Sequence, residues 1–206
     1  CMSSCSVIFQ SGIQSIAAST YPSEDSDMLG AEAAYCALEA ELQYEVDHYE
    51  TMHPDYDEYH YDLEDIEHDP YVLISILTAY HGGAWTLDEV QGAMAMLFEK
   101  QYQLTEEVVT EVRYRTETRV DSYSYIDPDT GEWVTEYYEY DVQVPYNYYI
   151  CNVSLNNENL SHLPIYIMGQ EQVGMYAVYI SVLGNRPDLF GGTILEYTDH
   201  EIPEEY

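Results

Sequence analysis

Two histidines and five aspartates lie close together in one acidic stretch and are the first candidates for a metal site. Residues 47–69 hold ten Asp or Glu and no Lys or Arg. Calcium needs oxygen ligands that converge, and an EF-hand loop also needs Gly at its sixth position, but this stretch has no Gly. We therefore expect a solvated acidic face here. The candidate ligands are Asp55, Asp57, His60, Asp62, Asp65, His68 and Asp69.

The four cysteines are the next candidates for chemistry. Their spacings contain no Cys-x-x-Cys pair and match no zinc signature. A cysteine nucleophile needs a nearby His base, and neither Cys36 nor Cys151 has a recognisable nucleophile context. We expect buried or unreactive thiols, with a Cys1–Cys5 or Cys36–Cys151 disulfide as the alternative. A carboxylate pair for glycoside hydrolysis cannot be singled out among 39 acidic residues. The sequence thus predicts no catalytic, cofactor-binding or metal-binding residue.

The charge balance excludes several kinds of partner. The chain has 206 residues, with 5 Lys or Arg against 39 Asp or Glu and a net charge of −34. Binding to nucleic acid through its phosphates needs clustered basic residues and is therefore excluded. An anionic membrane surface is disfavoured for the same reason, and no apolar run is long enough to span a bilayer. Hydrophobic residues make up 46% of the chain, which is enough for a sizeable core.

Apolar spacing predicts four helices that would position these residues. The first runs from about Met28 to just before Pro54, and Glu32, Glu39, Glu41 and Asp47 are expected on its solvated face. Its buried stripe comprises Ala31, Tyr35, Leu38, Leu42, Val46 and Tyr49. The second helix starts at Asp69-Pro70 and ends at Gly82-Gly83. The third runs from a capping box at Thr86–Glu89 to about Tyr102, and the fourth spans residues 170–183.

After Leu104 the apolar period changes from 3.6 to 2, which predicts a long hairpin. Asp127-Pro-Asp-Thr-Gly131 favours a turn over a calcium loop, and Trp133–Val144 is the predicted return strand. Pro145 is expected to interrupt it, with a further strand over Tyr148–Leu155. We expect the arginines of the outgoing strand to face acidic residues of the return strand. These arginines are Arg113, Arg115 and Arg119, and their expected partners are Glu136, Glu139 and Asp141.

The predicted fold class is α+β, with about four helices and a long antiparallel β-hairpin extending from a small sheet. Residues 1–27 are interpreted as a lead-in segment, 28–195 as the α+β domain and 196–206 as a linker or tail. The hairpin arm over about residues 114–142 is rich in tyrosine, and it is the predicted contact surface; a purely stabilising ribbon is the alternative. The candidate contact residues are Tyr114, Trp133, Tyr137, Tyr138 and Tyr140.

Several sequence blocks together resemble one protein family. They are Tyr59-His-Tyr-Asp-Leu63, His68-Asp-Pro-Tyr71, Val112-Arg-Tyr-Arg-Thr-Glu-Thr-Arg119, Val142-Gln-Val-Pro-Tyr-Asn-Tyr-Tyr-Ile150 and Gly184-Asn-Arg-Pro-Asp-Leu-Phe190. They resemble the middle, non-catalytic region of cell-wall hydrolases encoded by conjugative transposons of Gram-positive bacteria. In that family a membrane helix precedes this region and an NlpC-type cysteine peptidase domain follows it. Ser4-Cys-Ser-Val-Ile8 looks like the segment after the membrane helix, and Tyr197-Thr-Asp-His-Glu-Ile-Pro203 looks like the linker into the peptidase.

The resemblance implies a module that acts without catalysis. The family's peptidase carries its nucleophile in an Asp-Cys-Ser-Gly motif, which this sequence lacks, so no catalytic residue can be carried over. The implied role is spacing, positioning or partner binding for a peptidoglycan hydrolase at the extracellular face of the membrane or in the cell wall. The implied partners are conjugation or cell-envelope proteins, or a hydrolase domain of the same parent chain.

Two other classes of function remain open from the sequence. Carboxylates spaced like phosphates could let the chain act as an acidic DNA mimic that inhibits a DNA-binding protein, and the high acidity favours this reading. An enzyme with an unrecognised acid or metal site is the other class. The resemblance favours the wall-associated module over both.

Overall fold

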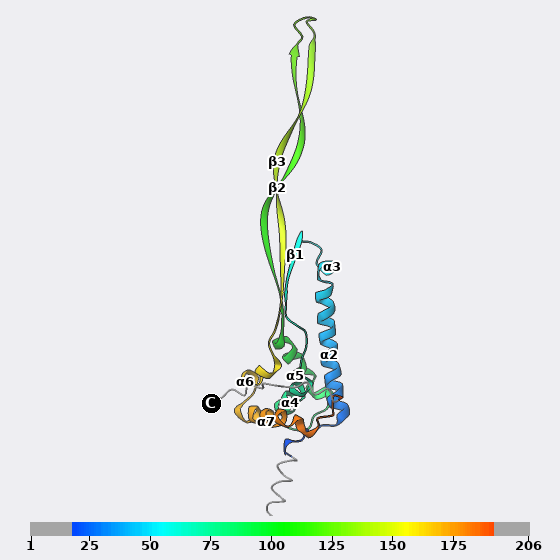
Figure 1. The fold of residues 1–206 in the computed structure, drawn as a ribbon, viewed down its shortest axis with the longest axis vertical. Helices are drawn as coiled ribbons and strands as arrows, with labels where there is room; N and C mark the ends of the chain where they lie inside the picture. The colour runs from blue at the N-terminus through cyan, green and yellow to red at the C-terminus, as the bar shows by residue number, and fades with distance from the viewer. Residues whose placement is uncertain (1–17, 192–206) are drawn as a thin grey trace, which may run out of the picture. The chain divides into compact units, whose positions relative to one another are not determined.

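The computed structural model describes residues 18–191, which form two compact units (Figure 1). Unit 1 comprises residues 18–48, 64–103 and 155–191, and unit 2 comprises residues 49–63 and 104–154. The described chain contains both helices and a three-stranded sheet with a long hairpin, which confirms the α+β fold class. The expected tail over 196–206 and most of the expected lead-in segment lie outside the described residues.

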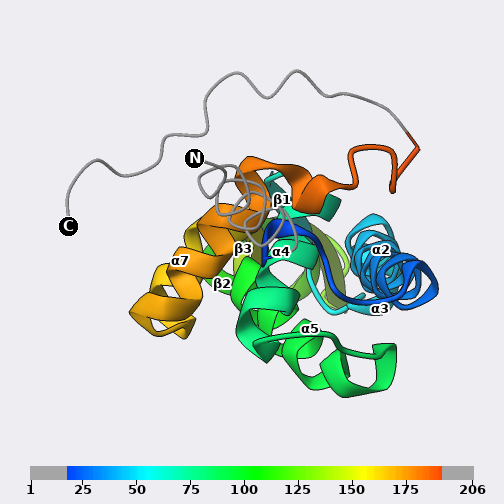
Figure 2. The same ribbon diagram turned by 90° about the horizontal axis from the view of Figure 1, so that it is seen from below.

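Unit 1 is built from helices around a central apolar one. α4 (Pro70–His81) contacts α2 (Asp25–Asp47), α5 (Leu87–Gln101) and α7 (Gln170–Ser181), as Figure 2 shows from below. α4 is buried continuously from Tyr71 to Ala79, because residues that are apolar almost all round require cover on every side. Three short helices complete the unit: η1 (Leu160–His162), α6 (Pro164–Ile167) and η2 (Leu183–Asn185).

The predicted helix ends of α4 are confirmed. The Asp69 carboxylate accepts a hydrogen bond of 2.8 Å from the Tyr71 amide, and Pro70 occupies the first turn. Gly82 ends the helix at φ 84°, a left-handed conformation that glycine adopts at little cost. α2 begins three residues before its predicted start. Tyr21, which was expected in the lead-in segment, is 3% exposed and contacts the buried Ser75 hydroxyl at 2.8 Å.

A single buried amide joins four segments of unit 1. Gln101, which is 1% exposed, accepts a hydrogen bond of 2.9 Å from the Tyr35 hydroxyl through its carbonyl oxygen. Its amide nitrogen lies 3.1 Å from the Glu67 carbonyl oxygen and 3.0 Å from the Asn157 side-chain oxygen. Apolar periodicity carries no information about such a polar side chain, so this network could not be predicted from it.

Unit 2 contains the sheet, in the order β1-β3-β2. Its elements are α3 (Tyr49–Met52), β1 (Glu58–Leu63), β2 (Tyr102–Ile126) and β3 (Trp133–Asn157), of which the last two strands each have an end in unit 1. Its core contains Tyr49, Cys151 and Val153, with Tyr56, Tyr59 and Leu104 packed against it.

The first strand makes the sheet a mixed one. β1 runs parallel to β3, because the Asp57 amide donates to the Tyr149 carbonyl and the Glu64 amide donates to the Leu155 carbonyl. Its residues lie in the stretch that was interpreted as an acidic face without a strand. The alternation of polar and apolar residues from Glu58 to Leu63 is a strand pattern, which the surrounding carboxylates obscured.

The predicted break at Pro145 is wrong, because β3 is one continuous strand of 25 residues. Asp57 and Glu64, which flank β1, donate backbone hydrogen bonds to Tyr149 and Leu155, so β1 covers only the later part of β3. At Pro145 the strand therefore has β2 on one side and an edge on the other. A proline is tolerated at an edge because its missing N–H removes no bond to a neighbouring strand there.

Replacing Gln101 by Leu should destabilise the protein by about 2 kcal/mol or more, because each buried polar partner left without a hydrogen bond costs about 1–3 kcal/mol. Urea unfolding measures the change. Gln91→Leu is the matched control, since Gln91 is exposed on the same helix and its replacement should change stability by less than about 0.5 kcal/mol. Equal midpoints for the two variants would show that the buried network contributes nothing.

Candidate functional site

The hairpin of β2 and β3 keeps one register over its length, which decides where each aromatic side chain points. Ser124 and Thr135 pair across the ribbon at 2.8 Å, Thr118 donates to Asp141 at 2.8 Å, and Gln143 donates to Thr116 at 2.7 Å. Each step along β2 is matched by an equal step backward along β3, so no bulge intervenes between these pairs. Successive side chains of a strand point to opposite faces. Even-numbered residues of β2 therefore share a face with odd-numbered residues of β3.

One face of the ribbon carries a tyrosine cluster. Tyr123 and Tyr138 meet across the strands with ring centroids 6.2 Å apart, and each also has a tyrosine neighbour on its own strand at about 6 Å. The hydroxyls of Tyr123 and Tyr125 donate to the Glu136 carboxylate, which raises the pKa of both phenols. The rings of this cluster thus already contact one another. The tyrosine cluster consists of Tyr123, Tyr125, Tyr138 and Tyr140.

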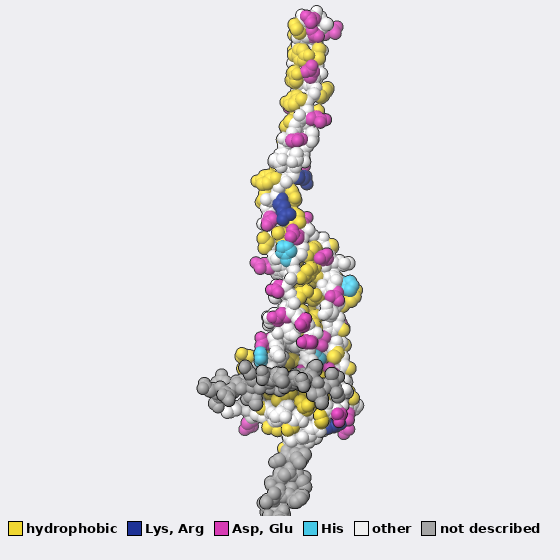
Figure 3. Space-filling model, viewed as in Figure 1, with side chains coloured by type: hydrophobic (Ala, Val, Ile, Leu, Met, Phe, Trp, Pro, Cys, Tyr) yellow, Lys and Arg dark blue, Asp and Glu magenta, His cyan; other side chains and the backbone are white. Residues whose placement is uncertain are grey.

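The opposite face, called the open face below, carries aromatic and aliphatic side chains that are more exposed than those of the tyrosine cluster. Trp133 is 72% exposed and Tyr137 is 75% exposed. Among residues 18–191, no ring contact is made by either of them. Figure 3 shows hydrophobic side chains along the ribbon among scattered carboxylates. The open face consists of Tyr114, Val120, Ile126, Trp133 and Tyr137.

The five predicted contact residues are therefore divided between two faces. Tyr138 and Tyr140 belong to the tyrosine cluster, whereas Tyr114, Trp133 and Tyr137 belong to the open face. Val120 and Ile126, which are 61% and 53% exposed, extend the open face and were missed. Strand alternation counted from the turn at 127–131 could have found both of them.

The expected cross-strand pairs between arginine and carboxylate groups are wrong. Arg113 lies 3.0 Å from Glu111, and Arg115 lies 2.8 Å from Glu117, in both cases two residues away on the same strand. In this register Glu139 and Asp141 lie on the face opposite to the arginines, whereas a carboxylate two residues away on the same strand shares their face. On the opposite strand, Glu136 and Asp141 accept hydrogen bonds from tyrosine and threonine hydroxyls. Exposed pairs of this kind contribute less than about 1 kcal/mol each.

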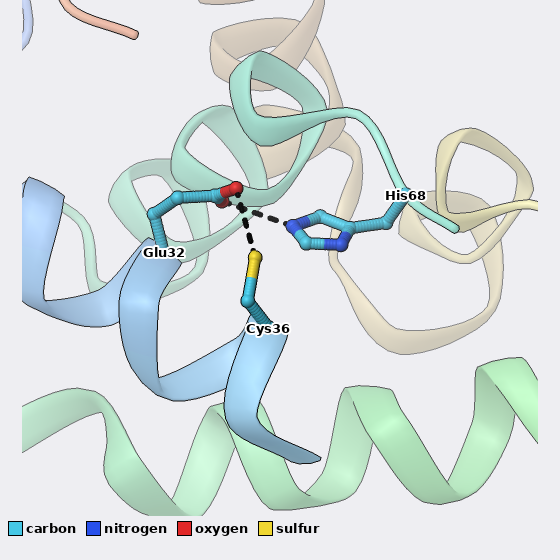
Figure 4. Close-up of side chains that lie close together, drawn as sticks. All are labelled: Glu32, Cys36 and His68. Atoms are coloured by element: carbon cyan, nitrogen blue, oxygen red, sulfur yellow. Dashed lines mark hydrogen bonds and ion pairs between the residues drawn. The ribbon is translucent and has the colours of Figure 1, made fainter. Parts of the chain in front are cut away.

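In unit 1, a second group of polar side chains surrounds His68 (Figure 4). His68 Nε2 lies 2.9 Å from Glu32 Oε2, and Nδ1 lies 2.9 Å from Glu39 Oε1. Cys36, one helical turn after Glu32, donates to Glu32 Oε1 at 3.4 Å. The expectation that Glu32 and Glu39 lie on a solvated face is wrong, since both are half-buried and contact His68, whose side chain is 2% exposed.

The surroundings of this group set its protonation. Burial alone would lower the pKa of His68, but its hydrogen bonds to Glu32 and Glu39 outweigh burial and raise the pKa to about 9. Burial and the neighbouring Glu32 carboxylate raise the pKa of Cys36 to about 11. Cys36 and Cys151 are both free thiols, so the alternative of a disulfide between them is wrong. A thiol with a raised pKa is a poor nucleophile at neutral pH.

Comparison with known proteins gives no family. No protein-family model matches the chain, and no curated protein or solved structure is significantly similar to it. Within residues 18–191, the search for a helix both long and apolar enough to cross a membrane finds none.

Replacing Tyr138 and Tyr140 together by Ser should loosen the hairpin, because cross-strand aromatic contacts contribute about 0.2–1 kcal/mol each. Amide hydrogen exchange in residues 119–125 should accelerate by about 5- to 30-fold, the equivalent of about 1–2 kcal/mol. Trp133→Ser with Tyr137→Ser is the matched control on the open face and should have a clearly smaller effect. Equal acceleration in both double variants would contradict a stabilising role specific to the tyrosine cluster.

Proposed function

We propose that the chain is a non-catalytic positioning and partner-binding module of an exported peptidoglycan hydrolase of a conjugative element, and that the open face of its hairpin is the contact surface. The proposal joins the sequence resemblance to one observation, the exposure of Trp133 and Tyr137 on the open face. The module acts at the extracellular face of the membrane or in the cell wall. Its partner is a conjugation or cell-envelope protein, or a hydrolase domain of the same parent chain.

The chemistry of the open face supports binding to protein. Trp and Tyr are the residues most enriched among those that dominate binding energy at protein interfaces. Trp133 and Tyr137 are each more than 70% exposed, so a partner could remove much of their apolar area from water. A partner would remove less apolar area from the tyrosines of the opposite face, because neighbouring rings already cover part of that area.

The distribution of arginines also favours the open face over the face with the tyrosine cluster as the contact surface. Every arginine of β2 lies on the same face as the tyrosine cluster, where Arg113 and Arg115 are paired with glutamates. The open face instead presents Thr, Ser and apolar side chains over residues 116–126 of β2, and no arginine, while Glu139 and Asp141 of β3 lie on it as well. Binding through such a surface depends mainly on apolar contact and is only weakly sensitive to salt, whereas a DNA mimic binds basic proteins mainly through charge.

The test is affinity capture from the envelope fraction of a conjugative Gram-positive host at low and moderate salt. We expect envelope or conjugation proteins, or an NlpC-type hydrolase, to be retained at moderate salt. The variant with Trp133→Ser and Tyr137→Ser should lose them by more than about tenfold, since hot-spot residues contribute about 2 kcal/mol or more. Tyr44→Ser with Tyr166→Ser is the matched control in unit 1, because both tyrosines are exposed there and their loss should change nothing.

Two outcomes would overturn the proposal. Retention of the same partners by the open-face variant would exclude this face as the contact surface. Recovery of restriction enzymes or repressors that elute with salt, whatever the variant, would support DNA mimicry instead.

A separate experiment tests the expectation that the chain has no hydrolase activity. The purified chain, incubated with Gram-positive peptidoglycan, should release no soluble muropeptides, because the family's nucleophile motif is missing and the two described thiols have raised pKa values. Release that disappears in Cys36→Ala or Cys151→Ala would show a cysteine hydrolase after all. A catalytically active NlpC-type peptidase serves as the positive control.

A further inference from the structure

We propose that Glu32, Cys36 and His68 form a zinc-binding site in unit 1. One ligand atom from each, namely a carboxylate oxygen of Glu32, Cys36 Sγ and a ring nitrogen of His68, lies within 4.8 Å of the other two (Figure 4). A tetrahedral zinc ion with bonds of about 2.0–2.3 Å places its ligand atoms about 3.3–3.8 Å apart. The three atoms are therefore within a small side-chain adjustment of a zinc geometry.

The elements that carry these ligands hold them in place. Glu32 and Cys36 are four residues apart on α2, so they lie one turn apart on the same face of the helix. His68 immediately precedes Asp69, whose side chain caps α4, so the start of that helix fixes the backbone beside the ligand. The His68 ring also packs edge-on against Tyr35, with centroids 4.7 Å apart. Each ligand thus comes from, or lies next to, a packed helix.

The second nitrogen of His68 is already oriented as in many zinc sites. Metal-binding histidines usually donate their other ring N–H to a carboxylate, which fixes the tautomer and the ring direction. Here Nδ1 lies 2.9 Å from Glu39 Oε1, and Glu39 in turn accepts a hydrogen bond of 2.5 Å from the Tyr102 hydroxyl. Nε2 remains directed at Glu32, on the side of Cys36. Glu39 is therefore a positioning residue.

The ion pairs of His68 with Glu32 and Glu39 do not explain why Cys36 lies beside them. Two carboxylates suffice to pair with a protonated histidine, and the thiol adds only one weak contact of 3.4 Å. A sulfur, an imidazole nitrogen and a carboxylate oxygen together are a ligand set for zinc, whereas calcium and magnesium take oxygen ligands. Cys36 is exposed, so the fourth position of the metal faces solvent and takes a water molecule.

The protons balance in the binding step. Zinc forms bonds to Cys36 Sγ, to His68 Nε2 and to one Glu32 oxygen, and the thiol proton and the Nε2 proton pass to solvent. One divalent cation replaces two protons, so the net charge of the group is unchanged and the surrounding packing meets no new electrostatic cost. Metal affinity consequently rises with pH, because protons compete for the same ligand atoms.

The test is cobalt and zinc binding to the full chain carrying Cys1→Ser and Cys5→Ser, so that Cys36 and Cys151 are the only thiols. We expect about one cobalt ion per chain, with a thiolate-to-cobalt charge-transfer band and tetrahedral visible bands that zinc abolishes. Adding Cys36→Ser should remove the charge-transfer band, whereas adding Cys151→Ala should leave it. Glu39→Gln should weaken zinc binding by about 10- to 100-fold, as loss of a group that orients a ligand does elsewhere.

Exposed carboxylates of this acidic chain provide the matched control. Glu41→Gln removes an exposed glutamate of α2 and should leave zinc affinity unchanged. A missing charge-transfer band in the parent protein, or one that survives Cys36→Ser, would overturn the site. Weak binding of several ions that no single substitution alters would show nonspecific association with the acidic surface. Circular dichroism melting verifies that each variant is folded, and the result is independent of the proposal for the hairpin.

Discussion

The unbroken antiparallel register of β2 and β3 is the constraint on which the account of this protein depends. Side-chain pairs from Thr116–Gln143 to Ser124–Thr135 keep the same alignment. A slip by one residue would move every side chain of one strand to the other face. The register therefore separates a tyrosine cluster that packs on itself from an open face that presents Trp133 and Tyr137. The first face packs the hairpin on itself, and the binding role that we propose for the hairpin rests on the second.

The two units provide different hydrogen-bond partners for their carboxylates. In unit 1, α2 turns two of its glutamates toward a buried histidine, so a protonated His68 offsets one of their two negative charges. In unit 2, carboxylates accept hydrogen bonds from phenols: Glu106 binds the hydroxyls of Tyr49 and Tyr56, which lowers the pKa of its carboxyl group. Tyrosine suits a chain with few basic residues, because its hydroxyl can pair with a carboxylate while its ring covers apolar surface.

Local signals in the sequence predicted local structure well. Asp69-Pro70 and Gly82 define α4, and the turn at 127–131 defines the hairpin, because capping and turn chemistry act over a few residues. The features that were not predicted depend on contacts between residues far apart in the sequence. The partners of His68 lie about 30 residues away on α2, β1 joins β3 across about 90 residues, and the tolerance of Pro145 depends on where β1 begins. The role of the candidate contact residues stays a prediction, and their division between two faces could not be predicted without the register.

Photo-crosslinking at two neighbouring positions of β3 distinguishes the open face, which we propose contacts the partner, from the opposite face. A photoreactive phenylalanine analogue would replace Tyr137 in one preparation and Tyr138 in another, because these adjacent residues point to opposite faces. Each protein would be irradiated in the envelope fraction of a conjugative Gram-positive host. We expect a specific crosslinked envelope or conjugation protein from position 137 and little or none from position 138. Equal crosslinking from both positions, or crosslinking from position 138 alone, would contradict it.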